Sequence, residues 1–144
     1  KIIRIFNTFG PNMQLNDGRV VTNLIVQALN DEDLTIYGDG SQTRSFSYVS
    51  DTVAGIIAMM ESNHYEVFNI GNPYEMTVKE LAETILKLTN SKSEIIYKPL
   101  PNDDPQQRRP DISKAKEKLN WEPKVDLETG LNTTIEWIKK ELSK

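Results

Sequence analysis

The sequence contains no cysteine and a single histidine, His64. Without cysteine, disulfide bonds and thiolate chemistry are excluded. His64 lies in a polar Ser-Asn-His-Tyr segment that is typical of a surface loop. A histidine-based metal site and a Ser-His-Asp triad are therefore nearly excluded, and we expect no metal ion.

Long hydrophobic runs and long basic runs are also missing. No apolar run approaches the roughly 20 residues that a membrane helix needs, and no signal-peptide pattern opens the sequence. The formal net charge is −4, so nucleic acid and anionic membranes are not expected as main partners. At 144 residues, 38% hydrophobic and 26% charged, the composition is that of one globular domain without a membrane segment.

Two signatures of nucleotide-dependent oxidoreductases are absent as well. Neither Gly-x-Gly-x-x-Gly nor Gly-x-x-Gly-x-x-Gly occurs, so no loop for the phosphates of a cofactor is recognisable. No tyrosine is followed four residues later by a lysine, which would be the usual base for hydride transfer. On these grounds the chain by itself lacks an obvious acid–base residue.

Apolar periodicity predicts alternating strands and helices. We expect strands at residues 2–6, 34–37, 45–49, 66–70 and 93–97, and helices at residues 20–29, 52–60, 112–119 and 127–142. A capping box, Thr77 to Glu80, opens one further helix. In the helix at 52–60 we expect Val53, Ile56, Ile57 and Met60 to face inward. This alternation predicts an α/β fold.

Residues 36–51 hold a Gly-Asp-Gly turn between two short apolar segments, followed by Arg44 and by a helix opened at Ser50 and Asp51. A hairpin with a solvated arginine is one interpretation. The other is a phosphate site, because a guanidinium binds phosphate through two parallel N–H groups. Arg19 and Arg108 also lie on loops, where binding residues concentrate. Each of these arginines has a neighbouring acid, Asp17 beside Arg19, Asp39 beside Arg44 and Asp104 beside Arg108, and these pairs could be ordinary surface ion pairs.

Five motifs in the same order resemble the extended short-chain dehydrogenases/reductases, the superfamily of nucleotide-sugar epimerases and dehydratases. Within it, the closer resemblance is to the UDP-glucuronic acid decarboxylases, also called UDP-xylose synthases. The matching segments are Arg4 to Pro11, Asn16 to Val21, Tyr37 to Arg44, Asn69 to Pro73 and Asp103 to Ala115, followed by Trp121-Glu122-Pro123. The resemblance covers essentially the whole chain.

The resemblance implies the C-terminal part of a Rossmann-like extended fold, with a small mixed α/β substrate-binding domain. Residues 1–30 would end the Rossmann-like domain, and residues 31–144 would form mainly the substrate-binding domain. The N-terminal NAD-binding half, with its glycine-rich loop and its Tyr-x-x-x-Lys pair, would then be absent, and this chain alone would be inactive. A homodimer is expected for the full-length enzyme, through helices of the other half.

The resemblance also implies the chemistry: tightly bound NAD, a UDP-sugar substrate, and conversion of UDP-glucuronic acid to UDP-xylose and CO2 through a 4-keto intermediate. It assigns Arg19 to the sugar carboxylate and the nicotinamide end, as the catalytic cation. Further residues would contact the cofactor (Thr8 and Gln14), the diphosphate (Asn7, Arg44 and Arg108) and the uracil (Tyr37).

Two departures from the family pattern and two alternative functions remain open. Asn12 stands where many relatives have arginine, and Gln14 stands at a variable position. Another dehydratase or epimerase of the same superfamily is one alternative, although the Asn-Asp-Gly-Arg segment favours a substrate that carries a carboxylate. A non-catalytic module that binds sugar nucleotides is another. The expected location is the cytoplasm, or the Golgi lumen if a membrane anchor precedes this segment.

Overall fold

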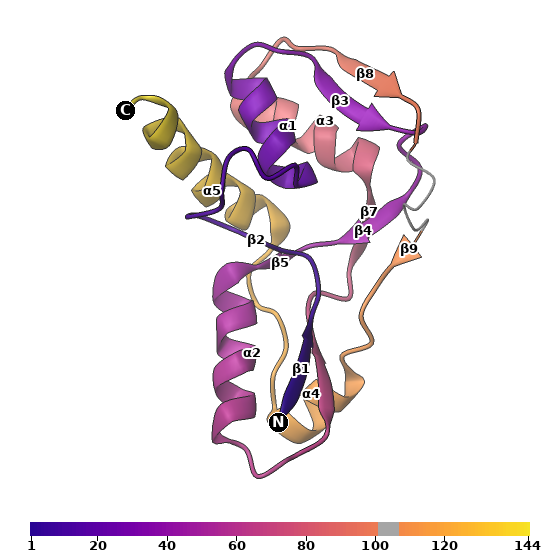
Figure 1. The fold of residues 1–144 in the computed structure, drawn as a ribbon, viewed down its shortest axis with the longest axis vertical. Helices are drawn as coiled ribbons and strands as arrows, with labels where there is room; N and C mark the ends of the chain where they lie inside the picture. The colour runs from indigo at the N-terminus through magenta and orange to yellow at the C-terminus, as the bar shows by residue number, and fades with distance from the viewer. Residues whose placement is uncertain (101–106) are drawn as a thin grey trace.

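The computed structural model describes residues 1–100 and 107–144 and is elongated, with two bodies joined at a narrower waist (Figure 1). Its strands are β1 (Ile2–Ile5), β2 (Thr8–Phe9), β3 (Leu34–Tyr37), β4 (Thr43–Ser45), β5 (Ser47–Tyr48), β6 (Val67–Ile70), β7 (Glu75–Thr77), β8 (Ile95–Lys98) and β9 (Gln107–Arg108). Its helices are α1 (Val20–Leu29), α2 (Val49–Glu61), α3 (Val78–Thr89), α4 (Ser113–Leu119) and α5 (Leu127–Leu142). None of the helices in these two ranges is long and apolar enough to span a membrane.

The strands pair across long stretches of sequence. β1 pairs with β6, β2 with β5, and β3 with β8, all in parallel. β4 lies between β7, which is antiparallel to it, and β9, which is parallel to it. Parallel pairs need crossover connections, and here helices provide most of them. The α/β fold class expected from the sequence is confirmed.

The upper body packs α1, α3 and α5 together, with β3 and β8 at its far end (Figure 1). Helix α1 has the bounds that periodicity predicts, and the face it buries is Val21, Leu24, Ile25 and Ala28. The capping box of α3 is confirmed, because the Thr77 hydroxyl accepts a hydrogen bond from the Glu80 N–H at 3.0 Å. The Glu80 carboxylate accepts one in return from the Thr77 N–H at 2.7 Å.

The lower body has its own core, formed by Met59, Phe68, Ile70, Ile112, Ala115 and Trp121. The prediction that Val53, Ile57 and Met60 face inward is wrong, since their exposed fractions are 46%, 47% and 68%. Helix α2 instead turns Gly55 toward the core. A Cβ atom at Gly55 would lie 2.7 Å from the side chain of Ile70, so only glycine permits this approach.

Asp51 fixes the same orientation of α2. Its backbone carbonyl accepts a hydrogen bond from the Trp121 indole N–H at 3.0 Å, and its carboxylate accepts one from the Val125 N–H at 2.9 Å. Asp51 therefore ties α2 to the segment between α4 and α5. The expectation that Ser50 and Asp51 open the helix is wrong, because the N-cap of α2 is Tyr48.

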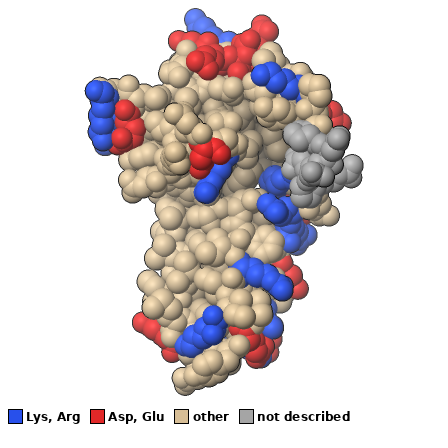
Figure 2. All heavy atoms as spheres, viewed as in Figure 1, with Lys and Arg blue, Asp and Glu red and all other residues tan. Residues whose placement is uncertain are grey.

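The turned-out side of α2 and strand β1 form an apolar surface, which we call the α2–β1 face: Ile2, Ile5, Val53, Ile57 and Met60. Few charged side chains lie over α2 and β1 in Figure 2. β1 pairs along one edge only within the described residues.

The expected strand at residues 45–49 is the largest error in element bounds. Phe46 separates β4 from β5, and α2 already begins at Val49. The hairpin interpretation of this region is also wrong, since β3 and β4 lie in different sheets. Strands β2, β7 and β9 are not predicted by periodicity, since each has only two or three residues. Four further elements, β1, β6, β8 and α4, have bounds that shift by one or two residues, and α2 begins three residues earlier and ends one residue later than expected.

The domain division at residue 30 stays a prediction. The larger core cluster combines Phe9 and Val21, which precede this position, with Leu34 and Leu131, which follow it. In the lower body, Ile3 packs against a cluster whose members all come after residue 58. Each core therefore draws on segments from both sides of residue 30.

Candidate functional site

A cavity of about 410 Å³ lies where β2, the start of α1 and β4 meet. Its walls are Ile5, Phe6, Asn7, Thr8, Phe9, Met13, Arg19, Val20, Val21, Arg44 and Phe46. Four of the seven residues singled out from the sequence line this one space: Asn7, Thr8, Arg19 and Arg44. The cavity thus combines two cations, an amide and a hydroxyl with mainly apolar walls.

Pairing of β2 with β5 positions Asn7 and Thr8. The Asn7 carbonyl accepts a hydrogen bond from the Ser47 N–H at 2.8 Å, which starts the ladder in which Thr8 lies opposite Ser47. The Asn7 amide nitrogen donates to the Ser45 carbonyl at 3.2 Å. That nitrogen carries a second N–H, so Asn7 can still donate to a ligand.

Thr8 belongs to a chain of three hydroxyl groups that runs from the cavity wall into the core. Its Oγ1 lies 3.0 Å from the Thr52 Oγ1, which lies 3.2 Å from the Ser47 Oγ. Thr8 also donates to the Phe6 carbonyl at 2.9 Å. Thr52 donates to Ser47, and each hydroxyl has one proton, so Thr8 donates either to the Phe6 carbonyl or to Thr52. In both arrangements the Thr8 oxygen can accept a hydrogen bond from a ligand in the cavity.

Arg44 is buried, with 8% of its surface exposed, so the solvated arginine interpretation is wrong. Its guanidinium donates to the Thr43 carbonyl at 2.8 Å. Arg44 lies in register with Arg108 on β9, and residues paired in this way present their side chains to the same face of the sheet. The Asp39–Arg44 ion pair considered from the sequence is not formed. The Asp39 carboxylate instead accepts hydrogen bonds from the Ser41 N–H at 2.9 Å and the Ser41 hydroxyl at 2.6 Å.

Arg19 stands at the N-terminus of α1 as its N-cap residue. Its Nε lies 2.9 Å from the Asp17 carboxylate, so the surface ion pair considered from the sequence is present. The side chain of Arg19 is 65% exposed, which leaves its guanidinium accessible from the cavity side. The corresponding suggestion of a pair between Asp104 and Arg108 falls partly outside the described residues.

Three predicted site residues do not line the cavity. Gln14 is exposed on the loop before α1, and Tyr37 is 47% exposed at the end of β3. Arg108 is exposed on β9, beside Arg44 but outside the cavity walls. Their roles stay predictions.

Sequence reasoning missed the apolar walls Met13, Val20, Val21 and Phe46, and it missed the hydroxyl chain. One signal was available for the chain: Ser47 and Thr52 flank the start of α2 as small polar residues at a spacing of five. This pattern can be interpreted only with the observed orientation of α2, which leaves Thr52 4% exposed.

Glu75 ties together the three strands beside Arg44. Its carboxylate accepts hydrogen bonds from the Thr43 hydroxyl at 2.8 Å and from the Gln107 amide at 3.0 Å. These bonds, the one from Thr43 first, hold the pKa of Glu75 below its ordinary value, with Arg109 at 3.8 Å adding to the effect. Glu75 therefore stays ionised and keeps β7, β4 and β9 together.

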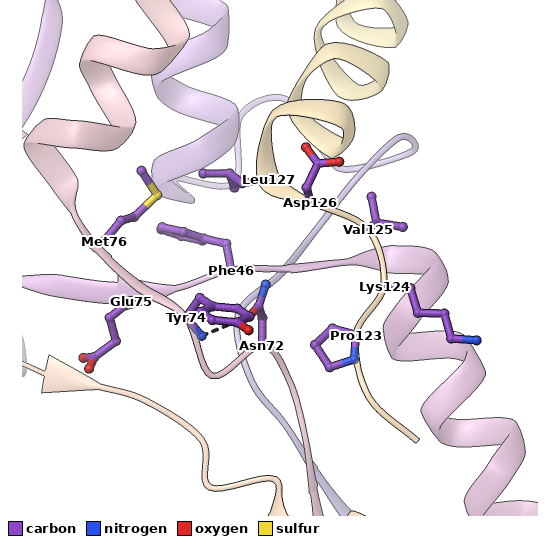
Figure 3. A pocket seen from close by; sticks show the side chains of 10 residues that line it. All are labelled: Phe46, Asn72, Tyr74, Glu75, Met76, Pro123, Lys124, Val125, Asp126 and Leu127. Atoms are coloured by element: carbon purple, nitrogen blue, oxygen red, sulfur yellow. Dashed lines mark hydrogen bonds between the residues drawn. The ribbon is translucent and has the colours of Figure 1, made fainter. Parts of the chain in front are cut away.

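A second cavity, of about 380 Å³, lies below the start of α5 (Figure 3). Phe46 lines both cavities and so separates them. The polar groups of this second cavity serve the fold: the Asn72 side chain accepts a hydrogen bond from the Tyr74 N–H at 3.0 Å. Asp126 accepts one from the Thr129 N–H at 2.9 Å as the cap of α5.

The model of the family described as GDP-mannose 4,6 dehydratase matches residues 1–134. The chain belongs to this family. Among curated proteins, this family member is 56% identical over 142 residues to UDP-glucuronic acid decarboxylase 1 of Danio rerio, covering 99% of this chain and 34% of that protein. It is 58% identical to UDP-glucuronic acid decarboxylase 3 of Arabidopsis thaliana, covering 91% of this chain and 38% of that protein.

Solved structures give the same fold. The UDP-glucose 4-epimerase of Thermotoga maritima, solved with UDP-glucose, aligns with a TM-score of 0.93 at 38% identity and covers 97% of this chain and 46% of that one. The UDP-glucuronic acid 4-epimerase of Bacillus cereus, in complex with UDP-glucuronic acid and NAD, aligns with a TM-score of 0.90 at 32% identity. The alignment covers 97% of this chain and 45% of that one. The chain thus has the fold of the C-terminal part of an extended short-chain dehydrogenase/reductase. It spans about a third of the length of its curated relatives and under half of these structures.

Proposed function

We propose that this chain forms the substrate-binding, C-terminal part of a UDP-glucuronic acid decarboxylase, which converts UDP-glucuronic acid to UDP-xylose and CO2. One observation carries the proposal: a single cavity brings together Asn7, Thr8, Arg19 and Arg44. These are the positions that the resemblance assigns to the diphosphate, the nicotinamide and the sugar carboxylate. The names of the most similar curated proteins support the same reaction.

The diphosphate would lie against Arg44, whose burial strengthens its attraction to an anion. Arg108 is placed to add a second cation, since it is in register with Arg44 on the same face of the sheet. Asn7 can donate its second amide N–H to a phosphate oxygen. For Tyr37 at the uracil and Gln14 at NAD, the resemblance alone supports the assignment.

The cavity fits the nicotinamide end of NAD. Its walls are mainly apolar, and Thr8 can accept a hydrogen bond from a carboxamide N–H, because its own proton is donated to Phe6 or to Thr52. The sequence has no glycine-rich loop for the pyrophosphate, so other residues would have to hold that part. When bound, NAD would accept the hydride from C4 of the sugar and return it after decarboxylation.

Arg19 has the role closest to bond breaking. A ketone at C4 makes the sugar a β-keto acid, whose C–C bond to the carboxylate breaks with release of CO2 and formation of an enolate. Arg19 would hold the carboxylate before this step and stabilise the negative charge that develops during it. The exposed guanidinium at the N-terminus of α1, where the helix dipole is positive, suits that task.

A 4-epimerase acting on the same UDP-sugar is the second candidate. The Bacillus cereus enzyme that aligns with this chain carries this activity in its name and was solved with UDP-glucuronic acid. A carboxylate-binding arginine suits that reaction too. Release of CO2 from UDP-glucuronic acid separates the two functions, because an epimerase retains the carboxylate in its product.

The decisive experiment replaces Arg19 by Ala in the full-length protein. We expect kcat for CO2 release to fall by about 10²–10³, while the affinity for UDP changes little. Lys140→Ala, an exposed cation on α5, is the control and should match the wild type. Equal losses of turnover and of UDP affinity would contradict the role of Arg19, and a wild-type protein that forms an epimer without CO2 would contradict the proposed reaction.

A homodimer and a cytoplasmic location are part of the proposal, and the resemblance alone supports them. Light scattering on the purified full-length protein tests the first. Fractionation of cells that express it tests the second, and recovery with a membrane fraction would contradict the cytoplasmic assignment.

A further inference from the structure

Asp17 holds Arg19 at two points. One carboxylate oxygen accepts a hydrogen bond from the Arg19 backbone N–H at 3.1 Å, and the other lies 2.9 Å from the Arg19 Nε. The Asp17 side chain is 18% exposed, against 65% for that of Arg19. The aspartate is therefore the less exposed partner, held by two contacts, and the Arg19 side chain that it contacts lines the cavity.

The local sequence Asp-Gly-Arg produces this contact. Gly18 has φ of 77°, in the left-handed region that glycine favours. A Cβ atom at Gly18 would meet nothing within 4 Å, so the glycine serves the backbone turn and not a close approach. The turn brings the carboxylate of residue 17 back to the N–H of residue 19, as aspartate does in Asx-turns.

Contact at Nε determines which edge of the guanidinium is offered to a ligand. An arginine can bind a carboxylate through the edge that contains Nε or through the edge formed by its two terminal nitrogens. Asp17 occupies the Nε side of Arg19. The terminal edge, with two parallel N–H groups, is the one left for a second carboxylate.

Asp17 also lowers the cost of placing two cations around one cavity. Arg19 and Arg44 both line it, and like charges in a partly apolar space repel each other. The Asp17 carboxylate balances one of them before a substrate binds. An ion pair as exposed as this one adds little to the stability of the fold. The main effect of Asp17 is therefore to orient the Arg19 side chain.

We propose that Asp17 is a positioning residue that fixes the terminal edge of Arg19 toward the cavity, and so makes the site prefer UDP-sugars that carry a carboxylate. This inference rests on the proposed function, in which Arg19 binds the carboxylate of UDP-glucuronic acid. It adds a determinant of specificity that does not itself touch the substrate.

The test uses Asp17→Asn in the full-length protein. Asparagine keeps an oxygen for the backbone N–H of Arg19 but loses the charge that holds Nε, so the turn survives while the guanidinium is released. We expect the preference for UDP-glucuronic acid over UDP-glucose, measured by competition binding, to fall about fivefold. KM for UDP-glucuronic acid should rise with it, while the inhibition constant of UDP stays within about twofold of the wild-type value.

Asp31→Asn is the matched control, since Asp31 is exposed and its φ of 55° is one that asparagine adopts readily. Asp17→Ala should lower the preference at least as far as Asp17→Asn. An unchanged preference in both Asp17 variants, or an equal loss of affinity for all three ligands, would overturn the inference. Absence of CO2 release from the wild type would instead count against the proposed function, and the binding preference would still decide the role of Asp17.

Discussion

Replacing Thr52 by Val tests the hydroxyl chain that links the cavity to the core. The substitution keeps the shape of the side chain and removes only the hydroxyl, which lies 3.0 Å from that of Thr8 and 3.2 Å from that of Ser47. Thr52 is 4% exposed and Ser47 is 0% exposed, so water does not replace the lost partner. Thr8 keeps its bond to the Phe6 carbonyl, whereas the Ser47 hydroxyl loses its partner.

The expected loss follows from that difference. A buried hydroxyl left without a partner costs about 1–3 kcal/mol, whereas removing both partners of a bond can be nearly neutral. Thr52→Val should therefore reduce the free energy of unfolding by about 1–3 kcal/mol. Ser47→Ala should reduce the free energy of unfolding by less, since the Thr52 hydroxyl keeps its hydrogen bond with Thr8. The double variant should be less destabilised than the sum of the single variants by about 1 kcal/mol.

Urea denaturation of the full-length protein, followed by circular dichroism, measures all three values. Thr133→Val is the control: its hydroxyl donates to the Thr129 carbonyl on the exposed side of α5, so we expect a change within about 0.5 kcal/mol. Strict additivity of the two core substitutions would refute the coupling. A Thr52→Val variant as stable as the wild type would refute a stabilising role for the hydroxyl chain.

Three further predictions concern the lower body. Gly55→Ala should destabilise the protein by about 1–3 kcal/mol in thermal unfolding, because the new Cβ would lie 2.7 Å from the side chain of Ile70; a neutral result would mean that α2 can move away from the sheet. In the isolated 144-residue chain, Ile57→Lys should reduce self-association measured by light scattering, because it breaks the exposed apolar α2–β1 face, whereas Met59→Lys should unfold the chain, since Met59 is 2% exposed. Hydrogen bonds from Lys118 and then Lys114 lower the pKa of Glu66 to about 2 from 4.5, so its contribution to stability should be present above pH 4.5 and be lost as the pH falls toward 2; Glu66→Gln should remove that part of the acid transition, and an unchanged acid transition would contradict it.

The long helices were predictable because their signals are local. The bounds of α1 and α5 follow from apolar residues at helical spacing, and the start of α3 follows from its capping box. Such signals involve only neighbours within a few residues along the chain. No partner elsewhere in the fold is needed to read them.

The short strands and the face of α2 were not predictable in this way. β2 and β5 have two residues each and exist because they pair with each other across some forty positions of sequence. Apolar spacing in α2 predicted the wrong inward face, because it shows which side of the helix is apolar but not which side packs against the core. The contact of Gly55 with Ile70 and Trp121 selects the opposite side, and periodicity contains no information about that contact.

The candidate site was predicted residue by residue from the resemblance, and the structure adds which of these residues line one cavity. Arg44 illustrates the limit: the sequence left it either solvated or bound to phosphate, and burial at 8% removes only the first option. Tyr37 lies at the end of β3 and Gln14 on the loop before α1, and neither of them lines the cavity.

The cavity and the waist between the two bodies depend on one strand register. Thr8 lies opposite Ser47, and this pairing puts the Thr8 hydroxyl within reach of Thr52 on α2. A slip of one residue in β2 would turn Thr8 to the other face, because side chains alternate along a strand. The same slip would withdraw Asn7 from the Ser45 carbonyl and so displace β4, which carries Arg44. Since one register sets both the hydroxyl chain and the position of the buried arginine, Thr52→Val should also weaken the UDP binding that we propose for Arg44.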